Sequence, residues 1–423
     1  MAEDDIYHNK SRYEKFIANL DGLTKAPKPS TATGRGIRKY YCKNPVNLIY
    51  FRNLDKHFQL KDNSYIRRLR LMRVFQIAVF VTEKELSQVT REDINEIVTF
   101  SHSVNLSPKS KADFIRDIRY IWKILFPETD ERGRIDETEV PYVVKHLSAK
   151  IDRSRERLRD DKITPNETEQ LIGYFSKNPQ MQFYIALSLE SLTRPQEACY
   201  LRLKDIEMTD SYAKIWVSSH GKEGVKFLQC LDSFPYLIKW YEQHPYKNDK
   251  NSFLFLAKGK RQLTPYNINK QLRFACKNLG IDKRITAYSL KRNGVTFARL
   301  RGDSDVQIQH RAGWTSTKQL KTYDMSDADD AFKRELAKRG IIKDEQYSDL
   351  TPKIRQCICG ATIGFAEKVC NKCKRITDRD SIKQMMDADD IAVSILEKLK
   401  EENKKMLQEA IKELKLTERI KNL

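Results

Sequence analysis

The chain contains few glycines and no long apolar segment. It has 15 glycines among 423 residues, with no glycine-rich phosphate loop and no internal repeat. No run approaches the ~20 apolar residues that a transmembrane helix needs, and the mean hydropathy is −0.65. The N-terminal sequence MAEDDIYHNK is acidic and polar, unlike a secretory signal. These absences exclude a membrane protein and predict a cytoplasmic one.

Acidic residues are outnumbered by basic ones. There are 58 aspartates and glutamates against 78 lysines and arginines, which gives a formal net charge of +20. Such an excess favours a polyanionic partner, and double-stranded DNA is expected rather than a membrane surface. The predicted DNA-binding residues are clustered in one helix and one connector: Arg67, Arg68, Arg70 and Arg73, and then Arg153, Arg155 and Arg157.

Cysteine is sparse, and four of the eight cysteines are scattered along the chain. These four are expected to be buried as small apolar side chains: Cys42, Cys199, Cys230 and Cys276. Thiols stay reduced in the cytoplasm, so clustered cysteines are interpreted as metal ligands before disulfides.

The other four cysteines form a cluster. Cys357 and Cys359 make a C-x-C knuckle, and Cys370 and Cys373 make a C-x-x-C knuckle. Four thiolates fill the tetrahedral shell of Zn²⁺ and leave no open position, so the pattern predicts a structural zinc ribbon. A thiol redox pair is the alternative, but it explains only one of the two knuckles. Basic residues around the cluster indicate that the ribbon contacts DNA phosphates.

A chain of this length exceeds one ordinary domain. Periodicity, charge and linker composition predict six segments: an N-terminal helix and basic arm (1–45), a helical DNA-binding domain (46–130), a basic linker (131–162), a mixed α/β domain (163–340), the zinc ribbon (341–376) and a charged C-terminal helix (377–423). Cap-like sequences at Thr90 and Thr164 predict helix starts. The basic arm is either a segment that orders on DNA or an inert linker.

The mixed α/β segment carries four signals in a fixed order. Arg194 and Glu197 lie one helical turn apart, and Lys222 lies in a turn between two predicted strands. The basic box YSLKRNG follows, and Tyr323 lies nine residues after Trp314. An arginine, a hairpin lysine, a basic box and a late tyrosine are the residues that phosphodiester exchange through a phosphotyrosine requires.

Each residue type suits that chemistry. A tyrosine nucleophile forms a covalent phosphate ester that conserves the bond energy. A DNA hydroxyl later attacks this ester and reverses the reaction. The transition state carries extra negative charge, which an arginine meets with its fork of donors. A mobile lysine protonates the departing 5′ oxygen. Neither ATP nor a catalytic metal is required.

These motifs resemble the tyrosine recombinase/integrase family of the phage-integrase type, over most of the chain. The tail YDMSDADDAFKREL and the cysteines after it are most similar to archaeal members. The resemblance implies a multidomain, mainly α fold, with a helical SAM-like core-binding domain, a mixed α+β catalytic domain, a small zinc ribbon and a C-terminal helix. It also implies a set of catalytic residues, with Glu197 in support: Arg194, Lys222, Trp314 and Tyr323.

One box departs from the family pattern. Where the family has His-x-x-Arg, this chain has Tyr288 and Lys291. Tyr288 keeps a hydrogen-bond donor without imidazole chemistry, and Lys291 keeps a charge without the bidentate fork. Both are predicted catalytic residues of a site that is slower, differently tuned or inactive. Arg292 and His310 are the residues that could compensate.

Two further alternatives concern the general acid and the last helix. Lys226 lies four residues after Lys222 and is the other candidate acid. The segment ILEKLKEENKKMLQEAIKELKL approximates a heptad stripe over about two heptads, which is short for a coiled coil. It is expected to pair with another copy or to dock on a catalytic domain. The resemblance implies a homo-oligomer, a tetramer on synapsed DNA.

Three functions follow from these observations. The first is a site-specific recombinase/integrase that forms a 3′-phosphotyrosine. The second is a catalytically weakened or inactive zinc-stabilised DNA-binding protein, which the Tyr288 and Lys291 departures favour. The third is a type IB topoisomerase-like enzyme, which shares the chemistry but acts as a monomer without a synapse.

Overall fold

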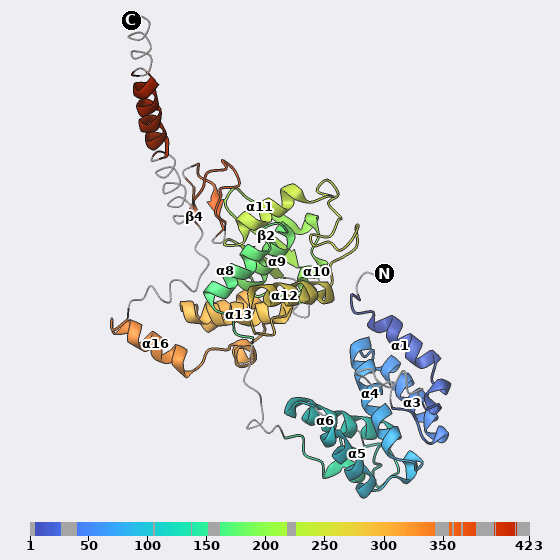
Figure 1. The fold of residues 1–423 in the computed structure, drawn as a ribbon. Helices are drawn as coiled ribbons and strands as arrows, with labels where there is room; N and C mark the ends of the chain where they lie inside the picture. The colour runs from blue at the N-terminus through green and yellow to red at the C-terminus, as the bar shows by residue number, and fades with distance from the viewer. Residues whose placement is uncertain are drawn as a thin grey trace, which may run out of the picture. The chain divides into compact units, whose positions relative to one another are not determined.

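The computed structural model divides the chain into two compact units, residues 1–158 and 159–423 (Figure 1). The described residues are 5–26, 40–104, 106–136, 138–150, 161–217, 226–342, 355–357, 359–364, 367–377, 393, 395–410 and 412. Within these ranges no helix has both the length and the apolar character to cross a membrane.

The first unit is built from helices, as predicted. They are α1 (Asn9–Ala18), η2 (Asp21–Thr24), η4 (Pro45–Asn47), α3 (Leu48–Leu60), α4 (Tyr65–Val81), η5 (Leu86–Gln88), α5 (Arg91–Ser103), α6 (Pro108–Leu125) and α7 (Tyr142–Lys145). Local capping signals fix two of the starts. Thr90 forms a capping box with Asp93 at α5, and Ser107 caps α6 with a proline at the first helical position.

One apolar core joins these helices. Phe51 of α3 and Phe75 of α4 meet edge to face, with ring centroids 4.5 Å apart, and α1 packs on α4. Val144 and Leu147 are buried in the same core. Part of the segment predicted as a basic linker therefore packs on the first unit.

Helix α9 (Pro179–Glu190) is the central helix of the second unit. It packs against α8 (Pro165–Tyr174), α10 (Pro195–Tyr200), α11 (Phe234–Gln243) and α13 (Ala287–Arg301). The capping box predicted at Thr164 is present, with Glu167 as its partner. The other helices are η7 (Leu203–Asp205), α12 (Pro265–Leu279), α14 (Asp305–Ala312), η8 (Thr317–Gln319), α15 (Leu320–Tyr323) and α16 (Ala328–Lys338).

A small antiparallel sheet has the order β1 (Ile206–Met208), β2 (Ala213–Val217), β3 (Lys226–Cys230). Val217 pairs with Lys226 at the end of the β2–β3 ladder. Alternate residues of β2 are buried, as expected for a strand with one face on a core. The predicted general acid Lys222 lies between these strands and outside the described residues.

Helices α13 and α9 approach closely because residue 294 is glycine. A Cβ at Gly294 would overlap the carbonyl oxygen of Leu189 and lie 2.8 Å from Leu192 Cδ2. Leu192 is buried with a φ of 52°, a left-handed conformation that costs roughly 1–2 kcal/mol in a residue with a side chain. Close packing therefore fixes the strained turn before α10 against α13.

The C-terminal part contains a two-stranded ribbon and a helix. Strands β4 (Arg355–Gln356) and β5 (Thr362–Ile363) pair antiparallel. Residues 395–410 are helical and exposed, so the charged C-terminal helix is present over this range.

Candidate active site

Arg194 and Glu197 form a buried pair at the start of α10. The backbone N of Arg194 donates to Glu197 Oε2 at 2.9 Å, and Nη1 donates to Oε1 at 3.2 Å. The two side chains are only 7% and 2% exposed. An exposed i,i+3 pair contributes a few tenths of a kcal/mol, but removing one partner here would leave a buried charge unpaired. The pair is a fixed part of the interior.

Lys226 joins this pair from β3. Its Nζ lies 3.0 Å from Glu197 Oε2 and donates to the carbonyl oxygen of Ala312 at 3.0 Å. Burial lowers the pKa of Lys226 more than Glu197 raises it, and Arg194 adds to the lowering. A lysine with a lowered pKa releases its proton more readily, which suits a general acid.

Lys291 is fully buried on α13. Its Nζ lies 5.6 Å from the ring centroid of Trp314 and 5.2 Å from that of Tyr323. It has no hydrogen-bond partner among the residues that the structure describes. Burial lowers the pKa of Lys291 well below its ordinary value, and the charge of Arg194 lowers it further.

Trp314 and Tyr323 stack beside Lys291, with ring centroids 5.2 Å apart and an interplanar angle of 29°. Gly313, with a φ of 70°, ends α14 and turns the chain into Trp314. Only a residue without a side chain adopts this conformation easily. The buried indole Nε1 has no hydrogen-bond partner within the described ranges.

The chain after Tyr323 is anchored to α13. Met325 N donates to Thr296 Oγ1 at 2.9 Å, and Asp324 Oδ2 lies 3.7 Å from Arg299 Nε. These contacts hold the tyrosine beside α13.

Tyr288 is the second residue of α13 and remains 43% exposed. Partial burial raises the pKa of Tyr288, and Tyr323 raises it further, while Arg194 lowers it. The net effect keeps the phenol protonated at neutral pH, so Tyr288 can donate a hydrogen bond but is a poor proton acceptor.

The assembled site favours an anion. One carboxylate, Glu197, faces the three basic side chains of Arg194, Lys226 and Lys291. Two buried donors, Lys291 Nζ and Trp314 Nε1, have no partner among the described residues. Buried donors without partners are costly, and a phosphate would supply the acceptors.

Arg292 and His310 are the two residues that could compensate for the altered box, and each has its own environment. Arg292 forms an ion pair with the buried Asp161, and His310 is exposed in the last turn of α14. Lys291 is therefore the basic residue of this box that lies beside Tyr323.

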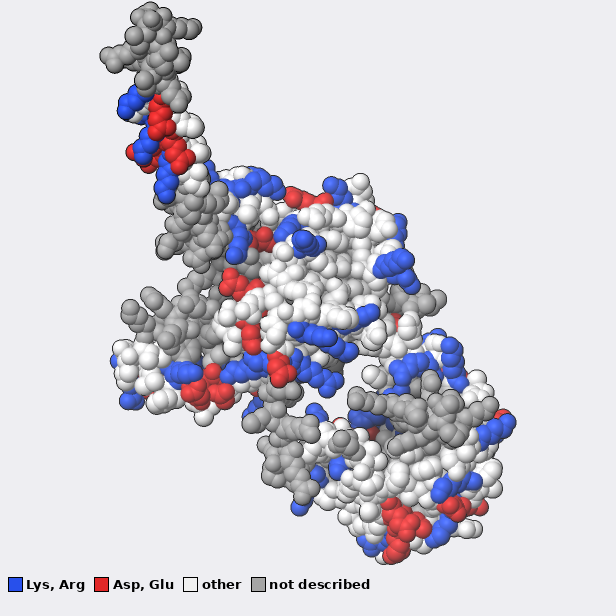
Figure 2. Space-filling model, viewed as in Figure 1, with Lys and Arg blue, Asp and Glu red and all other residues white. Residues whose placement is uncertain are grey.

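The predicted DNA-binding arginines of α4 differ in exposure. Arg67 and Arg70 are exposed, whereas Arg68 is buried and its Nε donates to a backbone oxygen at 2.6 Å. Burial lowers the pKa of Arg73, which is partly buried. DNA contact by these residues stays a prediction, although Figure 2 shows many basic side chains on the visible surface. The connector residues of the prediction lie outside the described ranges: Arg153, Arg155 and Arg157.

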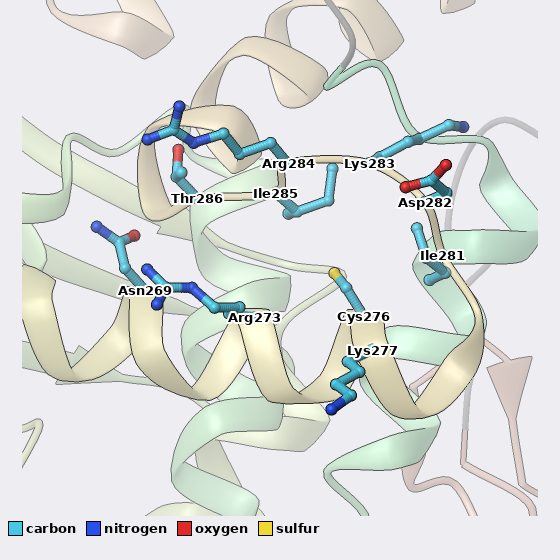
Figure 3. A pocket seen from close by; sticks show the side chains of 10 residues that line it. All are labelled: Asn269, Arg273, Cys276, Lys277, Ile281, Asp282, Lys283, Arg284, Ile285 and Thr286. Carbon is cyan, nitrogen blue, oxygen red and sulfur yellow. The ribbon is translucent and has the colours of Figure 1, made fainter.

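A basic pocket lies between α12 and the loop that precedes α13. Its volume is about 370 Å³. Figure 3 shows Arg273 and Lys277 on α12 and Arg284 on the loop. These three side chains are exposed, whereas Lys283 in the same lining pairs with Glu167 at 2.6 Å. The pocket adds cationic surface to the second unit, and none of its lining residues belongs to the predicted catalytic set.

The four clustered cysteines converge as predicted. Their Sγ atoms lie within 4.8 Å of one another, and the Cys357–Cys373 and Cys359–Cys370 pairs are 3.4 and 3.6 Å apart. Zn–S bonds of about 2.3 Å place tetrahedral sulfurs roughly 3.8 Å apart. The donor set therefore fits a metal ion such as zinc. The four scattered cysteines are buried, as expected.

The ribbon packs on α11 through contacts that the sequence does not signal. A Cβ at Gly364 would lie only 2.5 Å from the ring of Tyr236, so glycine permits this close approach. Lys239 Nζ lies 3.1 Å from Glu367 Oε1 and donates to Gln182 Oε1 at 2.9 Å. The ribbon is thereby attached to the surface of the second unit.

Comparison with known proteins identifies the second unit. Residues 161–329 match the phage integrase family, and no curated protein shows significant similarity to the chain. The chain therefore contains a phage integrase family domain, and its fold is that of the tyrosine recombinases.

Solved structures support the fold. The XerH site-specific recombinase bound to a palindromic difH substrate, a post-cleavage complex, is 15% identical with a TM-score of 0.52, covering 80% of this chain and 97% of that one. The Tn1549 transposon integrase in complex with transposon right end DNA is 15% identical with a TM-score of 0.53, covering 69% and 99%. A lambda integrase dimer bound to a COC′ core site is 14% identical with a TM-score of 0.50, covering 65% and 95%.

Replacing Lys291 with methionine should stabilise the protein, because it removes a buried amine whose protonated form is disfavoured by burial and by Arg194 while keeping the side-chain volume. The melting temperature should rise by about 2–4 °C for each kcal/mol recovered. Scanning calorimetry of the variant and of Lys247→Met, an exposed control, measures this.

The increase in melting temperature of Lys291→Met over wild type should be larger at low pH than at high pH. The unfolded chain binds a proton that folded Lys291 releases, so wild-type stability rises with pH from the lowered folded pKa towards the ordinary value of 10.5. The methionine variant lacks this contribution of residue 291 to the pH dependence of stability. An unchanged or lower melting temperature at every pH would contradict the buried-charge description.

Proposed function

We propose that the protein is a site-specific DNA recombinase/integrase that cuts and rejoins duplex DNA through a 3′-phosphotyrosine at Tyr323. The observation that carries this proposal is the convergence of α10, β3, α13 and the α14–α15 segment on one buried cationic site around Tyr323 and Trp314. The family domain and the fold support site-specific recombination, and the non-catalytic alternative is not favoured.

Strand cleavage begins when Tyr323 Oη attacks the scissile phosphorus. A bond from Oη to the 3′ phosphate forms as the bond to the 5′ oxygen breaks. Arg194 and the indole N–H of Trp314 donate to the non-bridging oxygens, whose negative charge grows in the transition state. Lys226 gives its proton to the departing 5′ oxygen, with Lys222 as the alternative acid.

Rejoining is the reverse reaction. A 5′ hydroxyl attacks the phosphotyrosine, the lysine takes back its proton, and Tyr323 leaves as the phenol. Since the ester conserves the bond energy, the cycle needs no ATP and no catalytic metal.

DNA binding draws on cations outside the site. Arg67 and Arg70 are exposed on α4, and Arg273, Lys277 and Arg284 surround the basic pocket. Lysines and arginines that neutralise phosphates release counterions and supply most of the sequence-independent affinity.

A tetramer on synapsed DNA is part of this proposal. The C-terminal helix exposes Leu396, Leu399 and Met406, an apolar stripe that could bury itself against another copy. A type IB topoisomerase-like enzyme would act as a monomer, and formation of a Holliday junction from two DNA duplexes distinguishes the two.

The cysteine cluster is proposed to hold structural Zn²⁺. All four sulfurs are needed to complete a tetrahedral shell, which leaves no position for a substrate. The DNA substrate and the thiolate site favour a cytoplasmic location, where thiols stay reduced. The similarity of the tail to archaeal members stays a prediction.

Replacing Tyr323 with phenylalanine should abolish the covalent protein–DNA adduct and leave DNA affinity nearly unchanged, because only the phenol oxygen is lost. A nicked suicide substrate traps the adduct on a denaturing gel, and a mobility-shift assay measures affinity. Tyr266→Phe, at an exposed tyrosine outside the proposed site, is the matched control and should still form adduct. Wild-type adduct levels from Tyr323→Phe would refute the nucleophile assignment.

The general acid can be identified with a 5′-bridging phosphorothiolate substrate, because a thiolate departs without protonation. Lys226→Ala should cleave ordinary DNA about 10²–10⁴-fold more slowly than wild type and should recover most of that loss on the sulfur substrate. Lys222→Ala is the paired variant. If only Lys222→Ala recovers its cleavage rate on the sulfur substrate, Lys222 is the general acid instead of Lys226.

Metal analysis should find about one zinc per chain, and Cys357→Ser should lower that content. Chelation should unfold the ribbon and weaken DNA binding, with a smaller salt dependence because fewer counterions are released. Cleavage of bound substrate should survive, since no metal ligand belongs to the tyrosine site. Full zinc content and unchanged DNA binding in Cys357→Ser would favour a redox role instead.

A further inference from the structure

The replacement of the box histidine by Tyr288 leaves a chemical gap in the proposed reaction. The nucleophile must lose its phenol proton as the Oη–phosphorus bond forms, and a positioned base accelerates such a transfer. Tyr288 cannot fill this role, since its own phenol stays protonated at neutral pH. Asp324, the next residue along the chain, is engaged by Ser326 Oγ at 2.9 Å and by Arg299.

We infer that Lys291, in its neutral amine form, accepts the phenol proton of Tyr323 during strand cleavage. This inference rests on the proposed recombinase function and assigns to Lys291 a reaction that an arginine at the same position cannot perform, because a guanidinium does not deprotonate in proteins.

The geometry places the amine beside the ring of the proposed nucleophile. Lys291 Nζ lies 5.2 Å from the ring centroid of Tyr323, and the phenol oxygen is on the rim of that ring. Direct proton transfer requires the lysine side chain to turn from the face of the ring towards the phenol oxygen. Because Nζ has no hydrogen-bond partner in the described part of the chain, no hydrogen bond of the amine must break first.

The surroundings favour the neutral amine. Arg194 and Glu197 from α10 and Lys226 from β3 are the charged groups that act on it. One carboxylate that is already shared by two cations cannot neutralise a third. Full burial adds a desolvation cost for the ammonium form. The titratable phenols nearby are Tyr288 and Tyr323.

Protons balance over the cycle. In cleavage the Tyr323 O–H bond breaks, Lys291 Nζ becomes an ammonium, and Lys226 or Lys222 gives one proton to the 5′ oxygen. In rejoining the 5′ hydroxyl returns its proton to that lysine, and the Lys291 ammonium reprotonates the leaving phenolate. In between, the new ammonium stabilises the phosphodiester beside it.

The test is the pH dependence of adduct formation on a suicide substrate under single-turnover conditions. The wild-type rate should rise with pH and then level off, because the fraction of neutral Lys291 saturates. Lys291→Arg should be slower by about 10²-fold or more at neutral pH, and its rate should keep rising with pH instead of levelling off, because no neutral amine remains to take the phenol proton. Lys247→Arg, an exposed control, should follow wild type.

A double variant separates a lost base from a damaged fold. Tyr288→His with Lys291→Arg restores an imidazole next to a fixed cation. It should regain wild-type rates or exceed them, with its inflection moved towards the ordinary histidine value of about 6.5. DNA affinity of all variants should match, which mobility shift checks.

Two outcomes overturn the inference by different routes. A Lys291→Arg protein with the wild-type rate and pH profile shows that Lys291 is not the proton acceptor, while the recombinase function stands. No adduct from wild type at any pH overturns the function itself, and the inference with it.

Discussion

The ion pairs of the buried Glu197 carboxylate are the interactions on which the proposed active site depends. The carboxylate accepts hydrogen bonds from the backbone N–H and the guanidinium of Arg194, and it forms an ion pair with the ammonium of Lys226. Two cations from different elements are thereby held in the interior at fixed positions. One negative charge cannot balance both cations, so the folded protein retains a local positive excess that favours an anion.

Burial changes the interpretation of Lys291 at the position where the family has arginine. In a solvated site, replacing arginine with lysine would remove a bidentate contact to phosphate without adding a new chemical function. Here the residue is fully buried beside the stacked rings of Trp314 and Tyr323, where a lysine can lose its proton and an arginine cannot. The buried amine destabilises the fold, as functional groups in active sites often do, and in exchange it supplies the base that Tyr288 lacks. The departure from the family pattern is thus compatible with activity.

The sequence predicted the elements that local chemistry decides. The helix starts at Thr90 and Thr164 and the four-cysteine cluster each depend on residues close in the chain, and all three are present. It did not predict contacts between distant segments, such as the bond from Lys226 to Ala312. Gly294 and Gly364 show the same limit, because the partners that require glycine there are far away in sequence. The ion pair of Arg292 with Asp161, which is far away in sequence, is another contact that the sequence does not signal.

The cysteine ribbon and the proposed catalytic residues have no residue in common, but both belong to the second unit. The ribbon packs on α11, which packs on the central α9. Mass mapping of the trapped DNA-linked peptide tests the central claim most directly, because it locates the covalent bond in wild-type protein. Protease digestion of the adduct should yield one nucleotide-bearing peptide, modified at Tyr323. Modification at Tyr288 or at any other residue would contradict the proposed active site.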